Sequence, residues 1–240
     1  MLDHEHIPAV EPDSKWLIVI LHGLGDSMEG FRWLPEALNL SWLNYLLVNA
    51  PDPYNDGYSW YDFMDDPDPG VTRSREALFE LLDAQRDNGH PTGQTFQFGF
   101  SQGCLMTMEV AMRYPHRLAG CVGVSGYLHE PEQAITELSS AAKEQNILFT
   151  LGTFDPLIPA EKVKGQLNLL RQDGGLEIQA NPIVKNGIIY TPVPPNKIVS
   201  IDGKNGKEIW NFSLEKGQVA RRGLLIWKSS SEEFSRVTRA

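Results

Sequence analysis

The chain has 240 residues, 41% of them hydrophobic, so it can bury the core of one or two domains and is not a disordered polymer. Its 31 acidic and 21 basic residues give a formal net charge of −10, which argues against a surface for nucleic acid or for anionic membranes. No apolar run approaches the ~20 residues of a membrane-spanning helix, and the acidic start shows no secretory signal, so we expect a cytoplasmic protein with no membrane span. Two cysteines, Cys104 and Cys121, make no disulfide framework or zinc site and are expected to be small buried residues.

The first 175 residues alternate short apolar runs with longer segments of helical periodicity. Three segments, 75–86, 102–113 and 160–171, carry apolar residues at helical spacing. Strands that alternate with helices predict an α/β fold, a mostly parallel sheet with helices on both faces. The runs expected to be buried strands are residues 16–21, 45–48, 95–100, 118–124 and 147–151.

The composition changes near residue 175. Residues 1–175 hold 25 acidic and 11 basic residues, whereas residues 176–240 hold 6 acidic and 10 basic ones, and all six histidines precede residue 130. Prolines and the dipeptides Asn186-Gly187 and Asn205-Gly206 now separate short β-like runs, which is typical of hairpins. We therefore predict two parts, an α/β domain over 1–176 and a β segment of different origin over 177–240. A basic face on one acidic domain would explain the charge equally well.

The sharpest motif is Gly99-Phe100-Ser101-Gln102-Gly103, which has the form G-x-S-x-G. It follows a predicted strand and opens a predicted helix, the context in which this motif forms a nucleophile elbow. The two glycines are needed because the serine occupies a strained turn in which larger side chains would collide with the crossing backbone. We predict that Ser101 is a catalytic nucleophile.

A glycine-rich loop, Leu21-His22-Gly23-Leu24-Gly25-Asp26, directly follows the first predicted strand. Such a loop can aim a backbone N–H at the substrate oxygen, so the N–H groups of Leu24 and Gln102 would form an oxyanion hole. The alternative is an ordinary glycine turn. His22 is a possible base, but its place at a strand end favours a packed, hydrogen-bonded histidine.

Asp155 follows the predicted strand 147–151 and precedes Pro156. A carboxylate at the end of a strand is well placed to orient a catalytic histidine. The alternative is an Asx turn or a cap for the helix that begins near residue 160.

Together these stretches, with Asn49-Ala50-Pro51 and Trp60-Tyr61-Asp62, resemble the bacterial serine esterases of the phospholipase/carboxylesterase family, relatives of acyl-protein thioesterases. The resemblance covers residues 16–176. It implies an α/β-hydrolase fold and hydrolysis of a small-molecule ester or thioester without a cofactor. Ser101 matches the nucleophile, Asp155 the triad acid, and Leu24 and Gln102 the oxyanion donors.

The family's third triad member is missing. The resemblance places the histidine base after one more strand, near Asn186-Gly187, but no histidine follows His129. This histidine would take the Ser101 proton and return it to the leaving group. The triad therefore lacks its base.

Residues 179–227 instead resemble one blade of the propeller of pyrroloquinoline-quinone dehydrogenases. The blade pattern is carried by Ser200-Ile201-Asp202, Gly206 and Trp210. One blade cannot close a propeller, which needs four or more, and the quinone site implied by that family is shared among blades. Three functional hypotheses follow: an impaired serine hydrolase, a catalytically silent acyl-binding protein, or a chimeric fragment without selected function. The sequence leaves the oligomeric state open.

Overall fold

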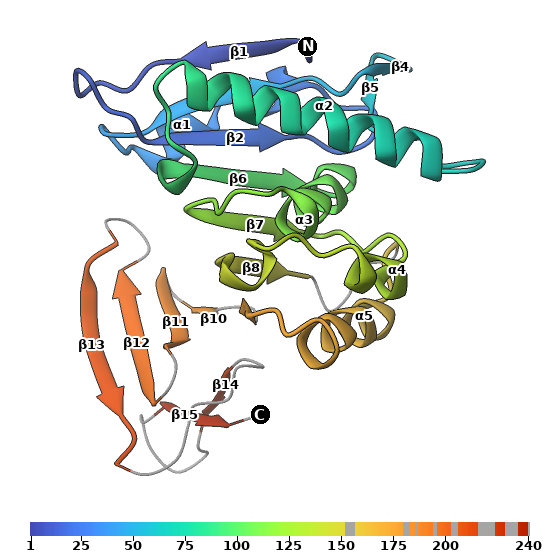
Figure 1. Ribbon diagram of the computed structural model, residues 1–240. Helices are drawn as coiled ribbons and strands as arrows, with labels where there is room; N and C mark the ends of the chain where they lie inside the picture. Colours follow the sequence, from blue (N-terminus) through green and yellow to red (C-terminus); the bar gives the residue numbers. More distant parts are fainter. Residues whose placement is uncertain are drawn as a thin grey trace. The chain divides into compact units, whose positions relative to one another are not determined.

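The structure is a computed structural model that describes residues 1–151, 157–179, 183–185, 187–193, 196–202, 206–215, 224–228 and 235–239 (Figure 1). The chain divides into two compact units, Met1–Ile178 and Gln179–Ala240, and each is described by itself. No helix among the described residues is long and apolar enough to cross a membrane.

The first unit is built on a seven-stranded sheet with the order β1-β3-β2-β6-β7-β8-β9. Five strand pairs of this sheet have a described register. The pairs β3/β2, β2/β6, β6/β7 and β7/β8 are parallel, and the edge pair β1/β3 is antiparallel. This confirms the mostly parallel sheet. The strands are β1 (His4–Ile7), β2 (Leu17–Leu21), β3 (Asn44–Val48), β6 (Thr95–Phe100), β7 (Gly120–Val124), β8 (Ile147–Thr150) and β9 (Ile178–Gln179).

Alternation along the central strands creates a hydrophobic core on each face of the sheet. On β2, Leu17, Val19 and Leu21 enter one core, whereas Ile18 and Ile20 enter the other. The first core also contains residues of α2, α3, α4 and α5, and the second contains residues of η1 and α1. The two faces are therefore both covered by helices, as predicted. The elements named here are η1 (Met28–Phe31), α1 (Leu34–Leu38), α2 (Asp68–Asp87), α3 (Gln102–Arg113), α4 (Pro131–Thr136) and α5 (Ala160–Gln172).

Cover is less complete at one end of the sheet. On the face of β7 and β8 opposite α3, Val122, Val124 and Leu148 are only half-buried, while Cys121 and Phe149 on the α3 side are buried. β7 and β8 thus bury one face against α3 and leave the opposite face partly exposed to solvent. The smaller elements are a hairpin of β4 (Asp52–Tyr54) and β5 (Gly57–Ser59), and the 3-10 turns η2 (Thr92–Gln94) and η3 (Ala142–Glu144).

Helix α2 begins seven residues before its predicted start at residue 75. Its first turn contains Pro69, which is tolerated where the backbone N–H has no helical partner. It also contains Gly70, where a side chain would lie 2.8 Å from Cα of Tyr61. Proline and glycine at these positions permit close packing of the first turn and do not end the helix.

The second unit contains a four-stranded antiparallel sheet with the order β10-β11-β12-β13, and a separate pair, β14/β15. The predicted hairpin chemistry is confirmed, since Gly187 and Gly206 have φ values of 76° and 70°, which favour glycine. The strands are β10 (Ile183–Lys185), β11 (Ile188–Val193), β12 (Lys197–Asp202), β13 (Glu208–Ser213), β14 (Leu224–Lys228) and β15 (Ser235–Arg239).

Candidate active site

Ser101 lies in the sharp turn between β6 and α3. Its backbone has φ 54° and ψ −114°, outside the region that a serine ordinarily occupies, and it is the N-cap residue of α3. The Ser101 N–H donates to the Val124 carbonyl at 2.9 Å, which fixes the turn against the end of β7. This geometry places the serine at the carboxyl edge of the parallel strands and at the positive end of a twelve-residue helix.

The glycines on both sides of Ser101 are required by close backbone contacts. A Cβ atom on Gly99 would lie 2.0 Å from the Gly103 carbonyl oxygen, and one on Gly103 would lie 2.4 Å from the Leu21 carbonyl oxygen. The first turn of α3 is therefore pressed directly against the elbow and against the end of β2. No side chain fits at either position.

The substitution Gly99→Ala is expected to destabilise the protein by about 3 kcal/mol, because the added methyl must displace the first turn of α3. Urea unfolding followed by circular dichroism measures the effect. The matched control is Gly93→Ala, since a Cβ at Gly93 meets no atom within 4 Å. Equal midpoints for the two variants would mean that the elbow tolerates a side chain.

The glycine-rich loop after β2 lies beside Ser101. A Cβ on Gly23 would be 3.2 Å from Cβ of Ser101. The next turn of the loop is fixed by the β4/β5 hairpin, since the Gly25 N–H donates to the Tyr58 carbonyl and the Tyr58 N–H to the Asp26 carbonyl, each at 2.9 Å. Leu24 lies between Gly23, which contacts Ser101, and Gly25, which is hydrogen-bonded to Tyr58.

The Gln102 side chain is buried and holds the start of α3 to the segment after β5. Its Oε1 accepts hydrogen bonds from the Trp60 N–H at 3.0 Å and the Ser59 hydroxyl at 3.2 Å, and its Nε2 donates to the Tyr61 carbonyl at 3.1 Å. Its backbone N–H belongs to the first turn of α3, where helical amides have no partner within the helix. The two amides predicted to form the oxyanion hole thus lie on two rigidly held segments.

His22 is fully buried, and both of its ring nitrogens have partners. Nδ1 donates to the Gly23 carbonyl at 2.7 Å, and Nε2 accepts from the Ala50 N–H at 3.0 Å, so the ring is neutral with its proton on Nδ1. Burial lowers the pKa of His22. The histidine that the sequence places in the glycine-rich loop is a packed residue without a free nitrogen for proton transfer.

The lowered pKa of His22 predicts a loss of stability in weak acid. In the unfolded chain His22 binds a proton near pH 6.5, whereas in the folded chain it binds one only at lower pH. The free energy of unfolding therefore decreases as the pH falls through 6.5 and below. We expect His22→Gln to show a smaller drop in urea midpoint between pH 7.5 and 5.5 than the parent chain. His90→Gln is the control, since His90 lies on the surface with Nδ1 3.1 Å from the Lys15 carbonyl oxygen. An unchanged drop in His22→Gln would contradict the assignment.

The comparisons with known proteins agree with this geometry. The model of a family described as phospholipase/carboxylesterase matches residues 2–180. The chain belongs to the phospholipase/carboxylesterase family. Acyl-protein thioesterase 1 of Schizosaccharomyces pombe is 35% identical over 156 residues, covering 60% of this chain and 70% of that protein. Acyl-protein thioesterase 1 of Candida albicans is 28% identical over 197 residues, which cover 73% of this chain and 85% of that protein. The crystal structure of esterase PE8 matches with a TM-score of 0.67 and 25% sequence identity. The match covers 74% of this chain and 86% of that chain.

A second family model, for the beta-propeller domain of glucose, ethanol and alcohol dehydrogenases, matches residues 161–240. The resemblances to the phospholipase/carboxylesterase family and to a dehydrogenase propeller blade are therefore confirmed, and the two matches overlap only over residues 161–180. The phospholipase/carboxylesterase part is a hydrolase of the esterase and thioesterase class with an α/β-hydrolase-like sheet. Asp155 lies within residues 152–156, outside the described residues.

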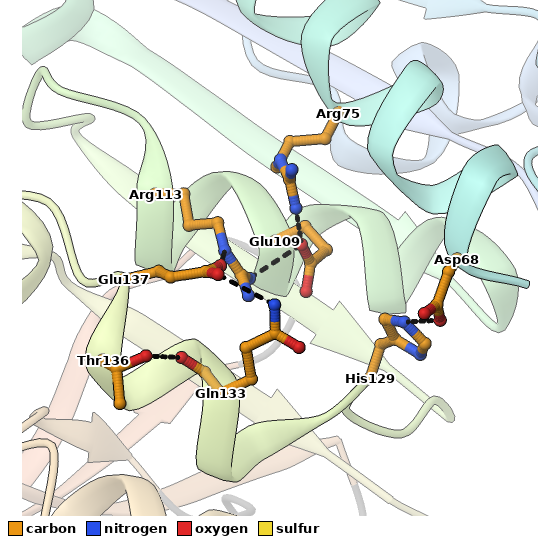
Figure 2. Close-up of polar contacts among 8 residues, drawn as sticks. All are labelled: Asp68, Arg75, Glu109, Arg113, His129, Gln133, Thr136 and Glu137. Carbon is orange, nitrogen blue, oxygen red and sulfur yellow. Dashed lines mark hydrogen bonds and ion pairs between the residues drawn. The ribbon is translucent and has the colours of Figure 1, made fainter.

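The other five histidines of this family member lie away from the elbow or have other partners. His4 and His6 are on β1, which β3 and β2 separate from β6. His90 lies against the chain just before β2, and His116 lies within 3.0 Å of Arg86 beyond the C-terminal end of α3. His129 is on the loop after β7, and its Nε2 lies 2.7 Å from Asp68 Oδ1 at the start of α2 (Figure 2).

One group of three ligating residues could hold a metal among the residues that the structure describes. Ligand atoms of Asp68, His129 and Glu130 lie within 4.8 Å of one another, and the two acidic residues are exposed. Spacing in the sequence does not reveal this group, because Asp68 lies 61 residues before His129. The contact between His129 Nε2 and Asp68 Oδ1 already explains this closeness, since it joins α2 to the loop before α4.

Both cysteines are buried, as expected. Burial raises the pKa of the Cys121 thiol to about 12 and also raises the pKa of the Cys104 thiol. Neither sulfur is a thiolate at neutral pH, so neither cysteine is a candidate nucleophile.

Proposed function

We propose that the chain is a serine hydrolase of esters or thioesters whose turnover is impaired because it lacks the general base. Ser101 Oγ bonds to the acyl carbon, the carbonyl oxygen becomes an oxyanion held by the Leu24 and Gln102 N–H groups, and the alcohol or thiol leaves. Water then releases the acid from the acyl-enzyme. Each step needs a group that accepts the Ser101 or water proton and returns it to the leaving group.

The observation that carries this proposal is the set of histidine positions. No histidine follows His129, and among the described residues no imidazole is hydrogen-bonded to Ser101. His22, in the loop beside the serine, has both nitrogens engaged. Asp155, proposed as the triad acid, then has no imidazole to orient, and only the oxyanion donors lower the barrier.

The half-buried face of β7 and β8 supports the proposal that residues 1–176 are a hydrolase domain cut before its last strand and histidine loop. Val122, Val124 and Leu148 are apolar residues that a further element of the same domain would cover. A propeller-blade sequence follows where that element is expected. We therefore propose that residues 177–240 have a separate origin.

Reaction with a fluorophosphonate tests the state of Ser101. We expect labelling at Ser101, detected by intact mass, at a rate about 10³-fold or more below that of a family esterase with a complete triad. Ser101→Ala removes the label. Ser125→Ala keeps it, and Ser125 is a matched control because it also has a positive φ, of 49°, at the end of the neighbouring strand. Labelling as fast as in a complete triad would contradict the proposal.

A silent acyl-binding function is the second candidate, favoured by the fixed elbow and glycine-rich loop in a chain without a base. It predicts that a non-hydrolysable acyl thioether binds with measurable heat in calorimetry while nitrophenyl esters are not turned over. Absence of any such heat would exclude this second candidate and leave the first to the labelling experiment.

A further inference from the structure

Three histidines come together at the edge strand of the first unit. His4 and His6 are on β1, opposite Val48 and Leu46 of β3. Directly opposed residues share a face of the sheet, and Val48 and Leu46 belong to the core that α2 covers. Both histidines therefore lie on the face that carries α2. The third, His90, follows the C-terminal end of that helix.

The rings of His6 and His90 have the spacing of two ligands of one metal ion. Their centroids are 5.8 Å apart, and the ring planes are tilted by 55°, so the rings are not stacked face to face. Two imidazoles that share a zinc ion through Zn–N bonds of about 2 Å have centroids roughly 5–6 Å apart. The observed separation therefore admits one ion between the two rings.

His90 is held in place through its backbone and through one ring nitrogen. Its N–H donates to the Gln85 carbonyl at 3.0 Å, and its Nδ1 lies 3.1 Å from the Lys15 carbonyl oxygen. A carbonyl accepts only from a protonated nitrogen, so the lone pair of the neutral ring is on Nε2. Metal-binding histidines commonly donate their second ring nitrogen to a backbone carbonyl in this way. His90 is thus an oriented ligand.

The His6 ring offers a lone pair at neutral pH. Within the described part of the chain, no hydrogen bond engages this ring. Burial, together with the positive charges of His90 and His4, lowers the pKa of His6. The neutral imidazole is the form that binds a metal, so protons compete weakly for this ligand.

We propose that His6 and His90 bind one late transition-metal dication of the zinc, nickel or copper type, with water in the remaining coordination positions. Imidazole nitrogen suits these ions, whereas magnesium and calcium prefer oxygen ligands. The ion would tie the edge strand β1 to the turn after α2. The whole of β6 separates His90 from Ser101, so this site is distinct from the elbow and goes beyond the proposed hydrolase function.

Calorimetric titration of the full chain with zinc at pH 7.5 tests the site. We expect one ion per chain, with a dissociation constant that rises at least about tenfold in His6→Gln and in His90→Gln. His129→Gln is the matched control, because it removes the histidine of the group with Asp68 and Glu130 and leaves the pair intact. No zinc binding, binding that neither histidine variant weakens, or binding that His129→Gln weakens equally would overturn the proposal.

Hydrogen exchange tests whether the ion joins the two segments. The amides of β1 are expected to exchange about tenfold more slowly at saturating zinc in the parent chain, and at an unchanged rate in His90→Gln, which leaves β1 itself intact. The urea midpoint without zinc checks that each variant folds. Equal slowing in His90→Gln, or no slowing in the parent chain, would contradict a metal tie between β1 and the turn. Neither experiment depends on hydrolysis at Ser101.

Discussion

Replacing residues 177–240 with a family-type tail that carries one histidine after the last strand is expected to raise kcat/KM for a short-chain nitrophenyl ester by about 10⁴–10⁶-fold. The reason is the path of the proton. Ser101 is held in a strained elbow beside a fixed glycine-rich loop, but no described imidazole bonds to it. An imidazole in the new tail would accept its proton and supply the partner that the proposed triad acid, Asp155, lacks.

The control is the same tail with its histidine changed to alanine, which separates the base from repair of the sheet. The unmodified chain could already hydrolyse the ester at ordinary esterase rates, and Ser101→Ala could abolish that activity. This result would contradict the proposal that the triad lacks its base and would mean that another residue acts as the base. His129 is then the residue to change first, because it lies on a loop at the same edge of the sheet as Ser101.

Glu109→Ala is expected to lower the free energy of unfolding by about 3–5 kcal/mol. The Glu109 side chain is 1% exposed, and its Oε2 lies 2.8 Å from Nη1 of Arg75 and 2.7 Å from Nη1 of Arg113. Figure 2 shows the carboxylate beside the two guanidinium groups; the pair with Arg75 joins α3 to α2, and the pair with Arg113 lies within α3. Its removal leaves both positive charges without this partner in a largely buried place.

Urea unfolding at neutral pH measures the loss. Glu161→Ala is the control, because Glu161 forms an exposed pair with Lys164 on α5 and such pairs contribute little to stability. A similar small change in both variants would show that the buried cluster of Glu109, Arg75 and Arg113 does not stabilise the fold.

Much of the fold follows from hydrophobic periodicity. The predicted strand at 95–100 and the predicted helix at 102–113 match β6 and α3 at both ends, because a strand-forming run meets a glycine turn there. β1 was missed, since His4–Ile7 is mostly polar and pairs only at an edge of the sheet. The start of α2 was missed because Pro69 and Gly70 resemble a turn when their packing against Tyr61 is unknown.

The site was predictable only where local chain geometry decides it. The elbow at Ser101 follows from two glycines and a strand-to-helix transition, and the structure gives the contacts that require them. The Glu109 cluster could not be foreseen in full, because only Arg113 lies on the same helix face, four residues on, while Arg75 approaches from α2. The same holds for Asp68 and His129, which only tertiary packing brings together.

The two sheets differ in how far apart along the chain their paired strands lie, and this sets the order in which they form. β2 pairs with β6, 78 residues later, whereas β10, β11, β12 and β13 each pair with the next strand through a short turn. Closing a long loop slows folding, so the local meander forms first when the denatured chain is returned to water. During refolding, β13, whose outer side pairs with no described strand, is therefore exposed before the sheet of the first unit is complete, and the yield of native protein should fall as chain concentration rises.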